Sequence, residues 1–165
     1  MQNLHWKKVD NTHFLCGENE TLLTLQINTN GNSSFKINSK EYTISKKGFW
    51  NPVIHIDAEN THILTLTHSL WGNSGRVVFY DGKTYTSYFK TGSHFKYSFL
   101  NNDREILSYN NIFVDKKSYL QFQIIEALLD ADKLLILAAL GMKVFSTYSK
   151  EISGDDGTFF LLTIA

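Results

Sequence analysis

The chain has 165 residues, which is the length of one ordinary domain and is sufficient to bury a single hydrophobic core. Its 16 basic and 16 acidic side chains cancel, so it lacks the positive charge expected of a dedicated nucleic-acid binder. Aromatic residues make up 14% of the sequence, which argues against a disordered chain. We therefore predict one folded domain, residues 1–165, with no nucleic acid among its partners.

A series of short segments between Leu4 and Ile125 alternates apolar and polar residues, which is typical of strands that are wet on one side. In the earliest clear example, the apolar residues Leu23, Leu25 and Ile27 lie on one face of the strand. The polar residues Thr24, Gln26 and Asn28 lie on the other. The same alternation predicts strands around residues 35–37, 54–58, 95–99 and 120–124. One face of each strand should point to a common interior.

Four dipeptides that tolerate positive φ predict tight hairpins between strands: Asn30-Gly31, Asp81-Gly82, Asn101-Asn102 and Asn110-Asn111. Successive hairpins give a meander of about twelve strands. So many strands in a domain of this size should curl, and closing the sheet also removes its exposed edges. We therefore predict an antiparallel barrel.

A helix is predicted at about residues 131–149, because the run from Leu134 to Phe145 has almost no polar side. Asp130 or Asp132 is expected to cap it. A helix that is apolar all round is stable only when it is surrounded. The run is shorter than the roughly 20 apolar residues that a bilayer requires, and Lys143 interrupts it, so we predict no transmembrane segment. The predicted fold is mainly β, a barrel of about twelve antiparallel strands that encloses a hydrophobic C-terminal helix.

The last residues, 153–165, form a turn followed by an apolar tail of the same domain. Such a tail is unlikely to remain in water. It is expected either to add one last strand to an open edge or to dock onto a partner or second subunit.

The segment of residues 132–142, Asp-Lys-Leu-Leu-Ile-Leu-Ala-Ala-Leu-Gly-Met, resembles the helix of small bacterial members of the tubby C-terminal-like superfamily. That superfamily includes tubby domains, phospholipid scramblases and LURP-one-related proteins. The resemblance covers Leu4 to about Lys150 and implies a barrel around the helix and binding of an anionic lipid. The tail from Gly157 to Ala165 departs from the pattern, and no motif matches the lipid-contacting basic residues of tubby domains, so no functional residue is carried over.

Basic residues at outward or turn positions are the best binding candidates in this neutral chain. Lys40-Glu41-Tyr42-Thr43 recurs as Lys83-Thr84-Tyr85-Thr86, a faint repeat that gives Lys40 and Lys83 matching places. The candidate site for an anion or lipid headgroup consists of Lys40, Lys83, Lys46, Lys47 and Arg76. The alternative is that these are scattered solubilising residues that protect strand edges.

No catalytic, metal or cofactor site is predicted. His62 and His68 are six residues apart in one predicted strand, about 20 Å, which is too far for a shared metal ion. Asp103 and Glu105 beside Arg104 resemble solvated charge. Trp6, Trp50 and Trp71 are expected either to form an exposed aromatic site or to pack at the core and rim of the barrel.

Cys16 is the only cysteine, so no disulfide can form within the chain and no thiolate cluster can hold a metal. It is expected to be a small buried side chain. The first eight residues lack the apolar core of a secretory signal, so we expect a cytoplasmic protein.

We predict a cytoplasmic, non-enzymatic binding or interaction module without a cofactor, which recognises an anionic lipid headgroup or a protein partner. One alternative is a hydrolase or metal-dependent enzyme whose site is assembled only in three dimensions. Another is a structural subunit that associates through its C-terminal tail.

Overall fold

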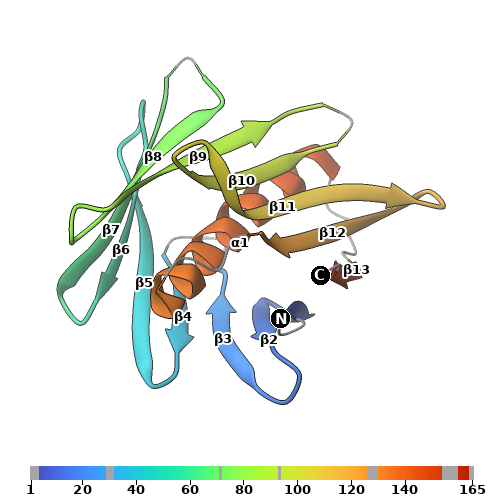
Figure 1. Cartoon of the computed structure of the whole chain (residues 1–165), viewed down its shortest axis with the longest axis horizontal. Coiled ribbons are helices and arrows are strands. Elements are labelled where there is room, and N and C mark those ends of the chain that lie inside the picture. Colours follow the sequence, from blue (N-terminus) through green and yellow to red (C-terminus); the bar gives the residue numbers. More distant parts are fainter. Residues whose placement is uncertain are drawn as a thin grey trace.

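A sheet curled around one helix forms the molecule, shown in Figure 1 as a computed structural model that describes residues 4–28, 32–70, 72–92, 94–125, 130–153 and 160–163. The helix is α1 (Ala131–Ser153). The strands are β1 (His5–Val9), β2 (Thr12–Cys16), β3 (Thr21–Gln26), β4 (Ser33–Ile37), β5 (Lys40–Lys47), β6 (Val53–Ala58), β7 (Thr61–His68), β8 (Ser74–Phe79), β9 (Thr84–Lys90), β10 (Lys96–Asn101), β11 (Arg104–Val114), β12 (Lys117–Ile124) and β13 (Phe160–Thr163).

Each strand from β1 to β11 pairs antiparallel with the next strand in the sequence, which is the predicted meander. The strand β13 then pairs in parallel with β12 and also contacts β1. The result is a nearly closed barrel in which β13 lies between the last antiparallel strand and the first (Figure 1). The described part of the tail, residues 160–163, therefore adds a strand to an open edge; residues 154–159 and 164–165 lie outside the described residues.

The barrel interior contains the side chains that the alternation assigned to it. Leu23, Leu25 and Phe35 are almost completely buried, whereas the polar residues between them are more exposed. Burial of apolar area contributes about 25 cal/mol per Å², so this shared interior is the main source of stability. It also fixes the register, because a shift by one residue would expose the whole apolar face of a strand.

The helix passes through the barrel, and its residues from Ile136 to Met142 are buried on every side. Asp130 caps it, since its carboxylate accepts a hydrogen bond of 3.0 Å from the backbone N–H of Asp132. The hydroxyl of Tyr109 on β11 donates a hydrogen bond of 2.7 Å to the carbonyl oxygen of Ala138. At the N-terminal end of α1, Lys133 forms an ion pair with Asp81 in the β8–β9 turn.

The two ends of the barrel differ. The N-terminal half of α1 lies next to the β8–β9 turn, and its C-terminal half lies next to the β5–β6 connection. We call the second end, where β5 ends at Lys47 and β6 begins at Val53, the distal mouth.

Two predictions about individual residues were wrong. Asn110 and Asn111 do not form a turn but lie inside β11, and the hairpin is made by Asp115 and Lys116, both with positive φ. Pairing decides this position, because Asn111 is opposite Leu120 and its side-chain oxygen accepts a hydrogen bond from Ser118.

Of the two alternatives for the tryptophans, Trp6 follows core packing, because only 1% of its surface reaches solvent. It lies on the inner face of β1, and its ring packs edge to face against Phe122 of β12 with centroids 6.2 Å apart. The second wrong prediction is Glu105, which is not free solvated charge because it forms an ion pair of 2.7 Å with Lys96 on the neighbouring strand.

Two further expectations concern the helix and the turns. The helix extends to Ser153, four residues beyond its predicted end. The turn at Asp81-Gly82 is confirmed, with positive φ at Gly82, and the turn predicted at Asn101-Asn102 lies one residue later, with positive φ at Asn102 and Asp103. The predicted turn at Asn30-Gly31 lies outside the described residues.

Candidate anion-binding pocket

A cavity of about 380 Å³ opens at the distal mouth, between the C-terminal half of α1 and the ends of the strands β5 to β7. Its walls combine apolar side chains with hydroxyl, amide and cationic groups. The lining residues are Asn28, Asn32, Ile44, Ser45, Lys46, Pro52, Ile54, His68, Lys143, Val144, Thr147 and Tyr148. A pocket of this size is large enough for a small ligand or a headgroup.

Strand alternation places Lys46 and His68 at this cavity. Lys46 follows the buried Tyr42 and Ile44 on the inward face of β5, and His68 follows the buried Leu64 and Leu66 on the inward face of β7. Both residues are the last inward positions of their strands. The interior therefore changes at the mouth from apolar to cationic.

The helix contributes Lys143 from the opposite wall. Lys143 stands between the buried Met142 and Val144, is itself half-buried, and lines the same cavity as Lys46. The side chain of Thr147, one turn later, donates a hydrogen bond of 2.9 Å to the carbonyl oxygen of Lys143. Two cations thus reach one cavity from elements that are almost a hundred residues apart in sequence.

The charge of the pocket is one-sided, because its described lining contains two lysines and one histidine but no carboxylate. The ion pairs found among the described residues do not include Lys46. Burial lowers the pKa of His68 below its usual value, and the positive charge of Lys46 lowers it further. The Nε2 atom of His68, a residue that lines both this cavity and the groove around Arg76, is buried and has no hydrogen-bond partner in the described chain.

The structure separates the five basic residues that the sequence singled out. Lys46 lines the pocket, whereas Lys47 is the next residue along β5 and points to the other face of the sheet. Lys40, at the start of β5, has its ammonium 5.4 Å from the ring centroid of Tyr42. Lys83 is in the β8–β9 connection at the opposite end of the barrel from the distal mouth.

Arg76, the fifth residue, lines a different and wider groove of about 790 Å³ across β7 to β10. That groove also contains Asp103, which offsets the charge of Arg76, and outward threonines such as Thr67 and Thr86. We consider the smaller cavity the better anion site because its described lining contains only cationic charge.

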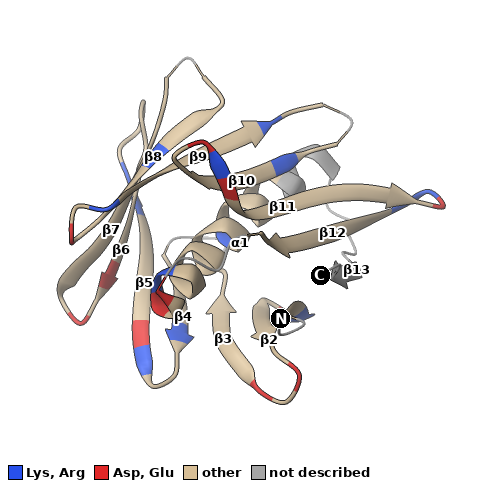
Figure 2. Cartoon of the chain, viewed as in Figure 1, with Lys and Arg blue, Asp and Glu red and all other residues tan. Residues whose placement is uncertain are grey.

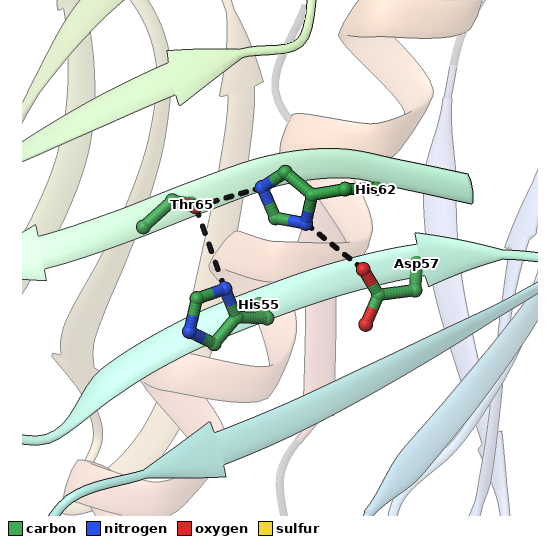
Figure 3. A network of polar contacts seen from close by, with 4 residues as sticks. All are labelled: His55, Asp57, His62 and Thr65. Atoms are coloured by element: carbon green, nitrogen blue, oxygen red, sulfur yellow. Dashed lines mark hydrogen bonds and ion pairs between the residues drawn. The ribbon is translucent and has the colours of Figure 1, made fainter. Parts of the chain in front are cut away.

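A polar network lies on β6 and β7, outside both of these cavities, and Figure 3 shows its four residues. The Nδ1 atom of His62 is 2.9 Å from the Asp57 carboxylate, and its Nε2 atom is 2.8 Å from the Thr65 hydroxyl. The same hydroxyl is 3.4 Å from Nδ1 of His55. The order acid, imidazole, hydroxyl resembles a catalytic relay, but His62 and Asp57 are both substantially exposed.

Sequence reasoning missed the main features of both sites. His55 and His62 flank the Glu59-Asn60 turn, and the hairpin brings their rings to 5.4 Å. The signal in the sequence was Asn60, a residue type that tolerates the positive φ of such a turn. The convergence of His68 and Lys143 had no local signal, because it depends on where the helix passes through the barrel.

Among the described residues, no group of three or more His, Cys, Asp and Glu side chains is arranged to hold a metal ion. None of the described helical residues forms a segment with the length and hydropathy that crossing a bilayer requires. No protein-family model, curated protein or solved structure matches this chain.

Proposed function

We propose that this protein is a non-enzymatic binding module that captures an anionic group, of the phosphate or sulfate type, in the cavity at its distal mouth. The observation that carries the proposal is the convergence of Lys46 and Lys143 on a cavity whose described lining has no carboxylate. Hydrogen bonds between charged groups are about twice as strong as neutral ones.

The neutral donors around the lysines suit the same ligand. Ser45, Asn28 and Thr147 bring hydroxyl and amide groups to the cavity wall, and His68 adds a ring nitrogen. Apolar side chains such as Ile44 and Ile54 line the rest, which favours a ligand with an anionic head and an apolar or neutral remainder. A lipid headgroup and a free phosphate ester share this chemistry.

The resemblance to the tubby C-terminal-like superfamily, which implies an anionic lipid, agrees with this proposal. A barrel around a C-terminal helix is the architecture that the resemblance leads us to expect. We accordingly propose the protein as a small member of that superfamily. The absence of a second cysteine in the sequence supports a cytoplasmic location.

The direct test is a titration of the whole protein with sulfate and with glycerol 3-phosphate, followed by NMR of backbone amides and histidine rings. We expect saturable shifts at Lys46, His68 and Lys143. The Lys46→Met and Lys143→Met variants should each weaken binding about tenfold or more, because one charge-assisted hydrogen bond contributes about 1.5–3 kcal/mol.

Lys47→Met is the matched control, since it removes the same charge from the next residue of β5 but from the other face of the sheet. It should bind both probes within about twofold of the wild type. Equal losses in the Lys46 and Lys47 variants would show a diffuse charge effect and overturn the pocket. Shifts confined to the groove around Arg76 would move the site there.

A hydrolase is the rival function, and the Asp57–His62–Thr65 arrangement is the observation that favours it. Its hydroxyl lies in the middle of a strand that pairs on both sides, so the neighbouring amides serve the sheet and not an oxyanion. Hydrolysis of a fluorogenic ester by the wild type, lost in both Thr65→Val and His62→Gln, would establish the rival. We expect neither substitution to alter sulfate binding.

A further inference from the structure

The distal mouth carries the two most exposed large hydrophobic side chains of the described chain. Phe49 is 88% exposed and Trp50 is 89% exposed, and both lie in the β5–β6 connection. Their rings pack edge to face on each other with centroids 5.3 Å apart, so they form one apolar projection. We call this pair the aromatic tip.

The backbone holds the aromatic tip outward. Gly48 has a φ of +96°, a conformation that favours glycine, and a Cβ at this position would lie 3.1 Å from the carbonyl oxygen of Asn51. The chain therefore makes a sharp turn at Gly48, and Phe49 and Trp50 project from the end of the hairpin. The neighbouring β7–β8 connection carries Leu70, which is 66% exposed. Figure 1 shows both connections projecting at the upper left of the molecule.

Exposed apolar residues gathered at loop ends mark an interaction surface, because single exposed side chains are ordinary but clusters are costly. Tryptophan favours the boundary between hydrocarbon and headgroups, where its ring is buried and its N–H stays near water. Projecting side chains suit insertion into a soft lipid surface.

Charge is distributed unevenly along the same hairpin: basic residues lie next to the aromatic tip, where an anionic membrane would attract them, and most acidic residues lie at the far end. Lys46 and Lys47 stand immediately behind the aromatic tip, whereas the opposite end of β5 and β6 carries three acidic residues and one basic residue: Glu41, Asp57, Glu59 and Lys40. Figure 2 shows acidic residues toward the lower ends of β5 and β6 and in the β6–β7 turn, with a basic residue beside the acidic one on β5. Anionic headgroups attract lysines near the surface by about 1 kcal/mol each, a difference of about fivefold in binding.

The spacing also fits the depth of a bilayer interface. Lys46 precedes Phe49 by three residues, which is at most about 10 Å of extended chain. Amphipathic elements bury their apolar side about 5–10 Å into the boundary between headgroups and acyl chains. With the aromatic tip at that depth, Lys46 and the pocket it lines would lie at the level of the lipid phosphates.

We infer that the distal mouth docks on an anionic membrane surface, with Phe49 and Trp50 inserted below the headgroups and the pocket of Lys46, His68 and Lys143 facing the lipid phosphates. This inference rests on the proposed function, because it names an anionic phospholipid as the source of the group that the pocket captures. It adds a second contact, the aromatic tip, that a soluble phosphate ester would not use.

Flotation with phosphatidylcholine vesicles, with and without phosphatidic acid, tests the inference on the whole protein. The Phe49→Ser/Trp50→Ser double variant should lose binding to anionic vesicles at least about tenfold while binding glycerol 3-phosphate like the wild type. Tyr80→Ser is the matched control, because Tyr80 is an exposed aromatic residue in the β8–β9 turn at the other end of the barrel. It should float like the wild type.

Emission from Trp50 gives an independent readout of insertion. In a Trp71→Phe background, where Trp6 is buried and constant, anionic vesicles should shift the emission to the blue and brominated acyl chains should quench it. Vesicle binding without a shift, or a double variant that floats like the wild type, would overturn the insertion of the aromatic tip.

The failures of the two proposals give different patterns. Binding of glycerol 3-phosphate without vesicle binding would leave the proposed function in place and reject the membrane. Vesicle binding with a blue shift, but unaffected by Lys46→Met and Lys143→Met, would keep insertion and reject the pocket. A wild-type dimer that the double variant converts to a monomer would assign the aromatic tip to a second copy of this chain and reject the membrane as well.

Discussion

The ring of Tyr109 lies directly against Gly141 in the middle of α1. A Cβ built on Gly141 would overlap with Cε2 of Tyr109 and lie 3.0 Å from Cε2 of Phe99. The absence of a side chain at this one position lets β10 and β11 approach the helix, and the Tyr109 hydroxyl reaches the carbonyl oxygen of Ala138 from the same side. The glycine inside the predicted helix is therefore a packing requirement.

Gly141→Ala should destabilise the protein by about 1–3 kcal/mol, because two aromatic rings in a packed core would have to move. The better helix propensity of alanine would return about 1 kcal/mol at most. Urea unfolding measures the difference. Gly17→Ala serves as the control, since the nearest atom to a Cβ there is 3.8 Å away. A Gly141→Ala protein as stable as the wild type would contradict the close packing of helix and sheet.

The ion pair of Lys133 and Asp81 should tie the start of α1 to the β8–β9 turn. Hydrogen bonds from Lys133 and from the backbone N–H of Lys83 lower the pKa of Asp81 below its usual value. A carboxyl whose pKa is lowered in the folded state stabilises that state above the unfolded pKa and loses this effect as the pH falls through the folded value.

The stability of the wild type should therefore decrease below about pH 4, and Asp81→Asn should remove that part of the decrease. At neutral pH the same variant should unfold at a lower temperature than the wild type. Asp103→Asn, in another exposed turn, is a suitable comparison. Identical acid profiles for wild type and Asp81→Asn would show that the pair does not contribute.

Anion binding should strengthen as the pH falls, because of His68. Burial first, and then Lys46, lower the pKa of this imidazole, so it is neutral in the free protein at physiological pH. A bound anion favours the protonated ring and raises its pKa. The other charged or titratable groups facing the cavity are Lys143 and Tyr148, which both come from α1.

Affinity for sulfate, whose own charge is constant in this range, should rise from pH 8 to below pH 6.5 and then level off. Calorimetry at several pH values measures it. His68→Gln should bind with an affinity that does not change over the range. A wild type without pH dependence would remove His68 from the site.

The C-terminal strand should stabilise the barrel. Because β13 pairs with β12 and contacts β1, truncation after residue 157 would expose backbone groups of β12 and uncover β1. We expect faster amide exchange in β1 and β12 and a lower unfolding temperature, with the same oligomeric state as the full chain. A change of oligomeric state on truncation would instead support the tail as a subunit interface.

Local sequence patterns determined most of the architecture of this protein. The period of two in segments such as residues 23–27 identified the inward faces, because side chains of a strand alternate between two environments. The apolar run from Leu134 to Phe145 identified a surrounded helix, because no orientation leaves a polar side for water. Both inferences depend only on neighbouring residues, and both were confirmed.

Tertiary structure decided what local patterns do not contain. Asn111 was expected in a turn, but pairing with Leu120 keeps it in a strand, and Trp6 is buried because β1 lies close enough to β12 for contact with Phe122. The sequence did not distinguish Lys46 from the other candidate lysines. It is distinguished in the structure because the path of the helix places Lys143 at the same cavity. A site of this kind depends on distances between residues far apart in sequence, and only the packing of the barrel around its helix sets those distances.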